Sequence, residues 1–148
     1  MTITYDDVIG SFLSKITEFE LIQLVTEERN LVLDGYLVRA AGSFNKVCEY
    51  DLSLKDSELR EFSADFEDED VDEILDIISE GMLVQWLKPY LYKQELLENV
   101  LNTTDFTTYS PAELLLRVGN AYAKAQKDYT QMIREYSYDH GDLTELHS

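Results

Sequence analysis

The sequence predicts a mostly α-helical, single-domain protein: a helical bundle with one long C-terminal helix and a flexible tail. The chain has 148 residues, which suits one hydrophobic core. Apolar residues recur at spacings of three and four over long stretches, as in amphipathic helices, and capping residues precede several of these stretches. We therefore expect residues 1–138 to form the helical domain and residues 139–148 the flexible tail.

The first two helices are predicted from caps and periodicity. One is expected to begin after Thr4, a good N-cap, with Asp6 and Asp7 in its first turn, where acids complement the helix dipole. A second is expected to begin after Thr26. Its apolar positions form one stripe that we expect to be buried: Leu33, Tyr36, Leu37, Ala40, Ala41 and Phe44.

A connecting segment is expected between Cys48 and Asp70. The helical period is lost there, and serine and aspartate turn formers mix with other acids. The segment is compatible with a short β-hairpin, with strands within Glu49–Leu54 and Leu59–Phe66.

A third helix is expected from about Asp70 to Leu87. Pro89 should end or kink it, because proline lacks the backbone donor and restricts the residue before it. A shorter fourth helix is expected over Tyr90–Leu101.

The long C-terminal helix has the clearest start. Ser110 is a good N-cap, Pro111 suits the first helical position, and Glu113 completes a capping box. A helix from there to about Tyr138 would be on the order of 40 Å long. Its apolar residues alternate at spacings of three and four, as in a helix packed along its length: Leu115, Val118, Tyr122, Ala125, Tyr129, Met132 and Tyr136.

The composition disfavours several classes of function. Thirty acids against twelve bases give a formal charge of −18, which disfavours binding to nucleic acid phosphates or anionic membranes. The single cysteine, Cys48, cannot form an intrachain disulfide, and neither a signal peptide nor a membrane-spanning run is evident. We expect the chain to fold in a reducing cytoplasm.

An acidic segment precedes the third helix and enters its first turn. As a calcium loop it would place Asp70 where an EF-hand needs glycine and Asp76 where glutamate is usual, so we interpret it as a solvated helix N-terminus. We name the following residues the acidic segment: Asp65, Glu67, Asp68, Glu69, Asp70, Asp72 and Glu73.

No other pattern indicates catalysis, a metal or a cofactor. His140 and His147 fall in the expected tail, where a metal site would first have to order the chain. Cys48 has no basic neighbour in sequence and is interpreted as a half-buried apolar residue. Since no nucleophile elbow, P-loop, dinucleotide fingerprint or zinc spacing occurs, we expect the protein not to be an enzyme.

Tyrosine is in excess, with ten residues, most of them in the C-terminal half. Core packing is the expected role of Tyr122 and Tyr129, which lie on the heptad seam. Tyr136 and Tyr138 lie where the long helix would extend past the core. Because tyrosine suits protein interfaces, we expect these two rings to contact a partner.

Three stretches together resemble neck proteins of tailed bacteriophages that infect Gram-positive bacteria, in particular the head-to-tail connector or adaptor. They are E-I-L-D-I-I-S-E-G-M-L-V-Q-W-L-K-P from Glu73 to Pro89, T-D-F-T-T-Y-S-P-A-E-L-L-L-R from Thr104 to Arg117, and M-I-R-E-Y-S-Y-D-H-G-D-L from Met132 to Leu143.

The resemblance implies a virion protein, made in the host cytoplasm, whose subunits form a ring, typically of twelve copies. The ring would sit between the portal protein and the tail-side neck proteins and line a channel through which DNA passes without specific binding. No membrane is involved. By analogy, the portal contact would fall at the C-terminal end: Tyr136, Tyr138, His140, Asp142, Leu143 and Leu146.

Three alternatives stay open. An acidic DNA mimic that inhibits a DNA-processing enzyme would need carboxylates spaced along one face like phosphates. A cytosolic helical protein-interaction module would need only an exposed docking face. An enzyme would need buried, paired carboxylates, and no such constellation is evident in the sequence.

Overall fold

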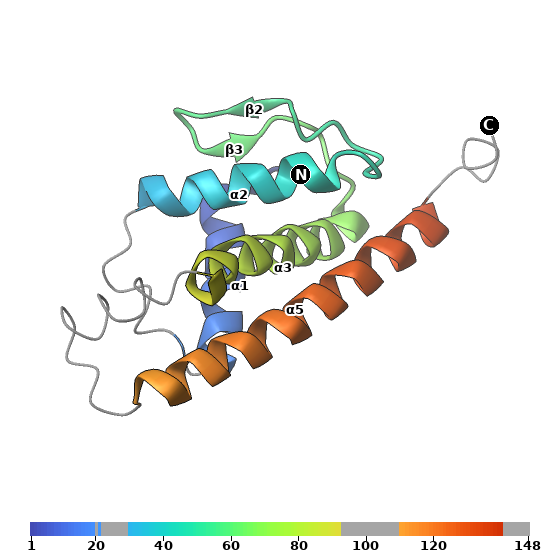
Figure 1. Ribbon diagram of the computed structural model, residues 1–148. Coiled ribbons are helices and arrows are strands. Elements are labelled where there is room, and N and C mark those ends of the chain that lie inside the picture. The colour runs from blue at the N-terminus through green and yellow to red at the C-terminus, as the bar shows by residue number, and fades with distance from the viewer. Residues whose placement is uncertain (20, 22–29, 93–109, 141–148) are drawn as a thin grey trace.

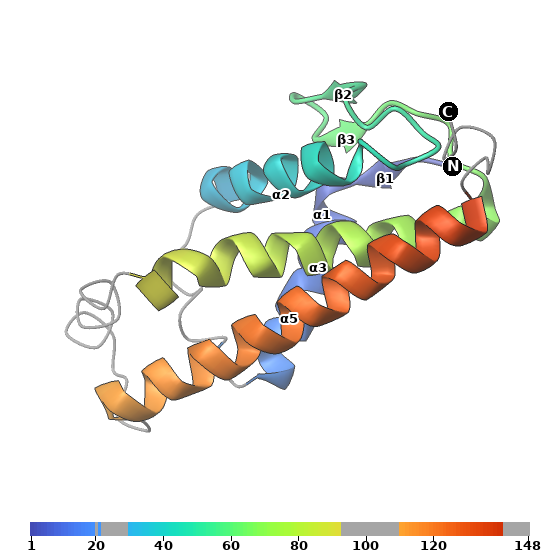
Figure 2. The ribbon, with the colours of Figure 1, turned by 45° about the vertical axis from the view of Figure 1, so that its right-hand side comes forward.

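The computed structural model describes residues 1–19, 21, 30–92 and 110–140. Within these residues it confirms the mostly helical fold with a long C-terminal helix (Figure 1) and adds a small three-stranded sheet (Figure 2). The helices are α1 (Tyr5–Glu18), α2 (Asn30–Phe44), α3 (Asp68–Tyr92) and α5 (Pro111–His140). The strands are β1 (Ile3–Thr4), β2 (Lys55–Asp56) and β3 (Glu61–Phe62).

Helix α1 begins as its sequence predicts. The Thr4 hydroxyl accepts a hydrogen bond from the Asp7 N–H at 3.1 Å, and the Asp7 carboxylate accepts one from the Thr4 N–H at 3.5 Å, which completes a capping box. Its buried face packs against α3, where the ring of Phe12 meets the edge of Trp86 at 5.6 Å between centroids. Both side chains are fully buried, so this contact lies in the core.

Helix α2 buries the predicted stripe. Leu33, Leu37, Ala40, Ala41 and Phe44 are buried and Tyr36 is half-buried. The predicted start after Thr26 lies outside the described residues.

Helix α3 is the centre of the molecule, since α1, α2 and α5 all pack on it (Figure 2). A helix surrounded by three others must be apolar on several faces, and α3 is. Its buried apolar residues include Ile74, Ile77, Ile78, Met82, Leu83, Trp86 and Leu87.

Of the two outcomes predicted at Pro89, an end or a kink, the end is wrong, because α3 continues through Pro89 to Tyr92. Proline in the last turn removes only one backbone hydrogen bond. The ring of Trp86 packs on Tyr90 at 5.3 Å, so apolar contacts hold the chain on both sides of Pro89. The first three residues of the predicted helix Tyr90–Leu101 therefore belong to α3, and the others lie outside the described residues.

The connector between α2 and α3 contains the predicted hairpin in a shorter form. Strands β2 and β3 pair antiparallel, and β1 adds to the other side of β3 to give the order β1-β3-β2. Strand β2 lies after the predicted range Glu49–Leu54, because Asp51 starts a turn in which its carboxylate accepts a hydrogen bond from the Ser53 N–H at 3.0 Å. The hairpin turn ends at Arg60, whose φ of 54° is left-handed.

Helix α5 is unbroken over 30 residues, about 45 Å. The Ser110 hydroxyl accepts a hydrogen bond from the Glu113 N–H at 3.2 Å, as the predicted cap requires. The helix runs along α3 in the opposite direction, so its C-terminal end lies beside the start of α3 (Figures 1 and 2). No helix within the described ranges is both long and apolar enough to cross a membrane.

Candidate functional site

Tyr136 is part of the core, so the prediction that its ring extends past the core is wrong. Its side chain is 0% exposed and packs edge-on against Phe44 at 4.9 Å between centroids. Its hydroxyl accepts a hydrogen bond from the Glu49 N–H at 3.1 Å. The prediction failed because the connector after α2 covers this end of α5, which helical periodicity in α5 cannot reveal.

His140 is the last residue of α5 and is not part of a flexible tail, contrary to the prediction. Its ring stacks on Tyr136 at 4.3 Å between centroids. Its Nε2 lies 2.6 Å from Oε1 of Glu73, and its Nδ1 lies 3.5 Å from Oε2 of Glu49. The end of α5 is thereby joined to the connector and to the first turns of α3.

The surroundings of His140 favour its charged form. Burial of the imidazole opposes the charge, but the hydrogen bond to Glu73 and the nearby carboxylates of Glu49 and Asp70 outweigh it and raise the pKa of His140. The imidazolium then also complements the negative end of the α5 dipole.

Cys48 is half-buried, as expected, with its Sγ 3.7 Å from the Tyr136 hydroxyl. Burial raises the pKa of the Cys48 thiol, which disfavours the thiolate that a nucleophile requires.

Among the described residues that were predicted to contact a partner, Tyr138 is the exposed one. Its side chain is 78% exposed, although it lies only two residues from the fully buried Tyr136. Asp142, Leu143 and Leu146, the other predicted portal contacts, lie outside the described residues, as does His147.

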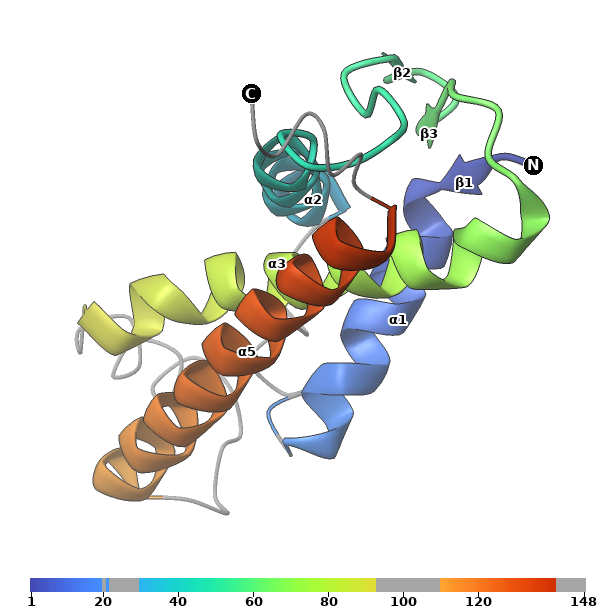
Figure 3. The same ribbon diagram turned by 90° about the vertical axis from the view of Figure 1, so that its right-hand side faces the viewer.

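Tyr138 ends a stripe of residues on the exposed side of α5, the helix that lies in front of α3 in Figure 3. All of them are exposed except Thr130, which is half-buried. None is acidic, although the chain has 30 acids, and a shallow groove over them is lined in part by Lys127 and Arg134. We name the following residues the outer stripe of α5: Ala112, Leu116, Asn120, Ala123, Lys127, Thr130, Arg134 and Tyr138.

The outer stripe was not predicted from the sequence, because the apolar seam of the long helix marks its buried face and not its exposed one. The spacing of these residues in the sequence could nevertheless have revealed the stripe. Positions separated by three or four residues from Ala112 to Tyr138 lie on one face, and none of these eight positions is acidic.

The acidic segment forms a solvated helix N-terminus, as interpreted from the sequence. Asp68, Glu69 and Asp70 occupy the first turn of α3. Its two half-buried carboxylates are engaged within the fold: Asp70 accepts a hydrogen bond from the Tyr50 hydroxyl at 2.6 Å, and Glu73 contacts His140. The other five side chains are exposed.

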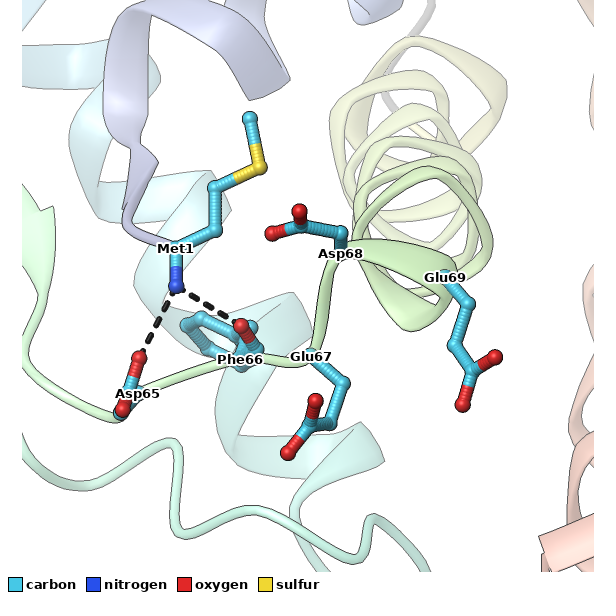
Figure 4. A pocket seen from close by; sticks show the side chains of 6 residues that line it. All are labelled: Met1, Asp65, Phe66, Glu67, Asp68 and Glu69. Carbon is cyan, nitrogen blue, oxygen red and sulfur yellow. Dashed lines mark hydrogen bonds and ion pairs between the residues drawn. The ribbon is translucent and has the colours of Figure 1, made fainter.

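The exposed carboxylates do not converge on one point. The Met1 amino group lies 2.9 Å from Oδ1 of Asp65. Figure 4 shows the Asp68 carboxylate on the side of Met1, whereas those of Glu67 and Glu69 point away from it. Among the described residues, no three His, Cys, Asp or Glu side chains are grouped so that they could hold a metal ion.

A buried carboxylate does occur between α1 and α3, and it is paired with a lysine. Glu80 is 5% exposed, and its Oε2 lies 2.9 Å from Nζ of Lys15, which also contacts Asp76 at 2.6 Å. Burial raises the pKa of Glu80. This arrangement joins α1 to α3 with both charges largely buried, so its geometry is that of an internal ion pair.

A second ion pair holds the sheet to the helices. Arg60 donates to both carboxylate oxygens of Asp34 on α2 at 2.7 Å and to Asp6 on α1 at 2.6 Å. Hydrogen bonding to Asp34 raises the pKa of Arg60 despite the opposing effect of burial, so the guanidinium stays charged. Partners that are 26 and 54 positions away leave no local pattern in the sequence.

No protein-family model, curated protein or solved structure matches this chain.

Proposed function

We propose that the protein is a non-enzymatic structural subunit, an adaptor in the neck of a tailed bacteriophage, that docks onto the portal protein through the end of its long helix. The observation that carries this proposal is the outer stripe of α5. It runs the length of a helix about 45 Å long, contains no acid and ends at the exposed ring of Tyr138.

The two faces of α5 differ in burial. One face is used within the subunit, because Leu114, Val118, Ala125 and Tyr136 are fully buried there. The opposite face places Leu116, 65% exposed, and Tyr138, 78% exposed, at its two ends. Tyrosine is enriched at protein interfaces because its ring buries apolar area while its hydroxyl stays hydrogen-bonded. A face with these properties suits contact with another protein.

The charge of the chain fits the same role. An adaptor ring lines a channel that DNA must cross, and a formal charge of −18 per subunit repels phosphates and so limits adhesion. In this proposal the subunits form a ring that also meets the tail-side neck protein, and DNA passes without specific binding.

The acidic DNA mimic is less well supported. Mimicry of duplex DNA requires carboxylates spaced along one extended face. The outer stripe, which runs along the longest helix in the described ranges, has none, and the exposed members of the acidic segment gather at one end of α3.

Binding to the portal protein tests the proposal. We expect Tyr138→Ala to weaken portal binding by about tenfold or more, because removing an exposed aromatic anchor at an interface costs roughly 1–2 kcal/mol or more. The matched control is Leu59→Ala, which removes another large exposed side chain, 67% exposed, from the β-hairpin turn. Equal portal binding by the Tyr138 variant and the native chain would contradict the placement of the contact.

A truncation probes the residues after α5. Because Tyr136 and His140 are part of the fold, the chain should be cut after His140 and not within the helix. We expect the truncated protein to unfold at the same denaturant concentration as the full chain and to bind the portal more weakly. Capture of a nuclease or polymerase in place of the portal would favour the DNA mimic.

A further inference from the structure

We infer that the outer stripe of α5 binds the acidic segment of a second copy of this chain, in a head-to-tail contact. This inference deepens the proposed adaptor function, because it names the surfaces that would join neighbouring subunits of a ring. It is supported by the charge of the two surfaces and by where they lie on the fold.

The outer stripe is the receptive surface. Lys127 and Arg134 are two turns apart, both exposed, and lie on the same face of α5. Ala123 and Thr130 are small, so a partner chain can approach the helix closely between and beside the two cations. The groove over this part of the helix is lined by both basic side chains.

The acidic segment is the complementary surface. Asp65, Glu67, Asp68, Glu69 and Asp72 are exposed and lie within eight consecutive positions at the start of α3. Opposite charges on two patches steer association and fix the register of a contact. Every copy of the chain carries both patches, so it can offer one to each of two neighbours.

The two patches of one subunit cannot satisfy each other. The outer stripe faces away from α3, because the opposite face of α5 is the one that packs on it. The acidic segment lies at the start of α3, which is beside the C-terminal end of α5 (Figure 2), where Glu73 contacts His140 and Tyr136 is buried. Complementary patches on different sides of one molecule favour a heterologous contact, which closes into a ring or continues as a filament.

A symmetric contact between two outer stripes is disfavoured by charge. Lys127 lies midway between Leu116 and Tyr138 in the sequence, so two antiparallel stripes in register would place Lys127 against Lys127. Two parallel stripes in register would place every cation opposite its own copy. Like charges in contact suppress both arrangements, whereas the acidic segment supplies the opposite sign.

Charge reversal followed by sedimentation analysis tests the inference. The native chain is expected to associate with itself at concentrations up to the order of 1 mM. The double variant Lys127→Glu/Arg134→Glu should be monomeric over the same range. The control is Lys46→Glu/Lys55→Glu, which changes the net charge equally at two exposed lysines outside both patches and should associate like the native chain.

A complementary variant makes the test specific. Glu69→Lys/Asp72→Lys should also fail to associate alone, yet an equimolar mixture with Lys127→Glu/Arg134→Glu should form a complex, because each supplies the charge that the other lost. Circular dichroism should first show native helix content for each variant. Restoration by mixing would support the contact between these two patches.

Several outcomes would overturn the inference. They are a native chain that is monomeric throughout, association that survives reversal of the outer stripe, and equal loss of association in the control. The proposed function fails separately, since it depends on portal binding. A chain that binds the portal through Tyr138 but never binds itself would keep the first proposal and remove the second.

Discussion

Tyr136 and Tyr138 show how sharply the environment changes over two residues. Successive residues of an α-helix are rotated by about 100° about its axis, so two side chains that are two residues apart lie on nearly opposite faces. Tyr136 accordingly is fully buried against Phe44, and Tyr138 is 78% exposed. The sequence placed both rings beyond the core, and only the structure separates a packing residue from a surface residue.

The pairing of His140 makes stability depend on pH. Its pKa is raised above the ordinary value of about 6.5, so the folded state binds the proton more tightly than the unfolded state does. The resulting stabilisation is fully present below pH 6.5 and is lost as the pH rises through the higher folded pKa. We expect His140→Gln to lower the free energy of unfolding by about 1 kcal/mol at pH 6.

Urea denaturation of the native chain and of His140→Gln at a series of pH values measures this effect. The difference between the two should shrink steadily from pH 6 to pH 9. A difference that is constant with pH would mean that the ring acts through its stacking on Tyr136 and not through its charge.

The ion pair between α1 and α3 belongs to the scale of helices. Lys15→Met leaves Glu80, 5% exposed, without its cation. Breaking a fully buried ion pair lowers the free energy of unfolding by about 3–5 kcal/mol. We expect a smaller loss of about 2 kcal/mol here, because Asp76, the second partner of Lys15, is half exposed to solvent. Burial raises the pKa of Glu80, so the loss should be larger at pH 8 than at pH 5, where the carboxyl can take up a proton.

Chemical denaturation of a double-mutant cycle checks this prediction. Lys15→Met/Glu80→Leu should regain much of the loss, since no charge is then left unpaired. The control is Lys124→Met, which breaks an exposed pair with Asp128 and should change stability little. A double variant no more stable than Lys15→Met would show that the pair itself is not the cause.

Gly81 lies where three helices pack closely together. A Cβ at this position of α3 would lie 2.8 Å from Cε1 of Tyr129 on α5 and 3.3 Å from Cβ of Ala40 on α2. We expect Gly81→Ala to destabilise the fold by about 1–3 kcal/mol, the usual cost of overpacking, although alanine favours helix formation.

The matched control for this prediction is Gly10→Ala in α1, where an added Cβ meets nothing within 4 Å. There the higher helix propensity of alanine should stabilise the protein by about 0.5–1 kcal/mol. Both effects are measurable as shifts in the denaturation midpoint. A stabilised Gly81→Ala variant would mean that Tyr129 can move aside without cost.

Helix starts were predictable because they depend on local chemistry. Thr4 and Ser110 each accept a hydrogen bond from an N–H three residues ahead, and such caps are visible in a short window of sequence. The continuation of α3 through Pro89 was not predictable, since it depends on packing around Trp86 and Tyr90. The pairing of Ile3 with Phe62 in the sheet was missed for the same reason, because neither two-residue strand has a pattern of its own.

In the candidate site too, features that depend on local sequence were predictable and features that depend on long-range packing were not. The exposure of Tyr138 was predictable from the sequence, because the long helix was predicted from local signals. The connection of His140 to Glu73 and Glu49 was missed, because it depends on the antiparallel course of α3 and α5. Residues far apart in the chain meet only through the arrangement of helices, and helical periodicity does not encode that arrangement.

At the scale of the molecule, the charge of −18 opposes compaction. Salt screens this repulsion, so raising NaCl from about 0.01 M to 0.5 M, which shortens the Debye length from about 30 Å to less than 8 Å, should stabilise the fold. We expect the melting temperature to rise by roughly 3 °C, which corresponds to about 1 kcal/mol for a domain of this size.

Thermal denaturation followed by circular dichroism checks this expectation. Glu67→Gln/Glu69→Gln, which removes two exposed charges of the acidic segment, should gain less from added salt than the native chain. A melting temperature that falls with salt would show that specific pairs such as Arg60 with Asp34 outweigh the general repulsion.

The central position of α3 also affects how the chain can fold during synthesis. Phe12 on α1 packs against Trp86 on α3, and α2 also uses α3 as its main packing partner. After the ribosome adds the last residue of α2, about 48 more residues must follow before α3 is complete at Tyr92, a delay of roughly 2–10 s at ordinary elongation rates. During that interval the nascent chain carries apolar helix faces without their partner, which is the state that chaperones recognise.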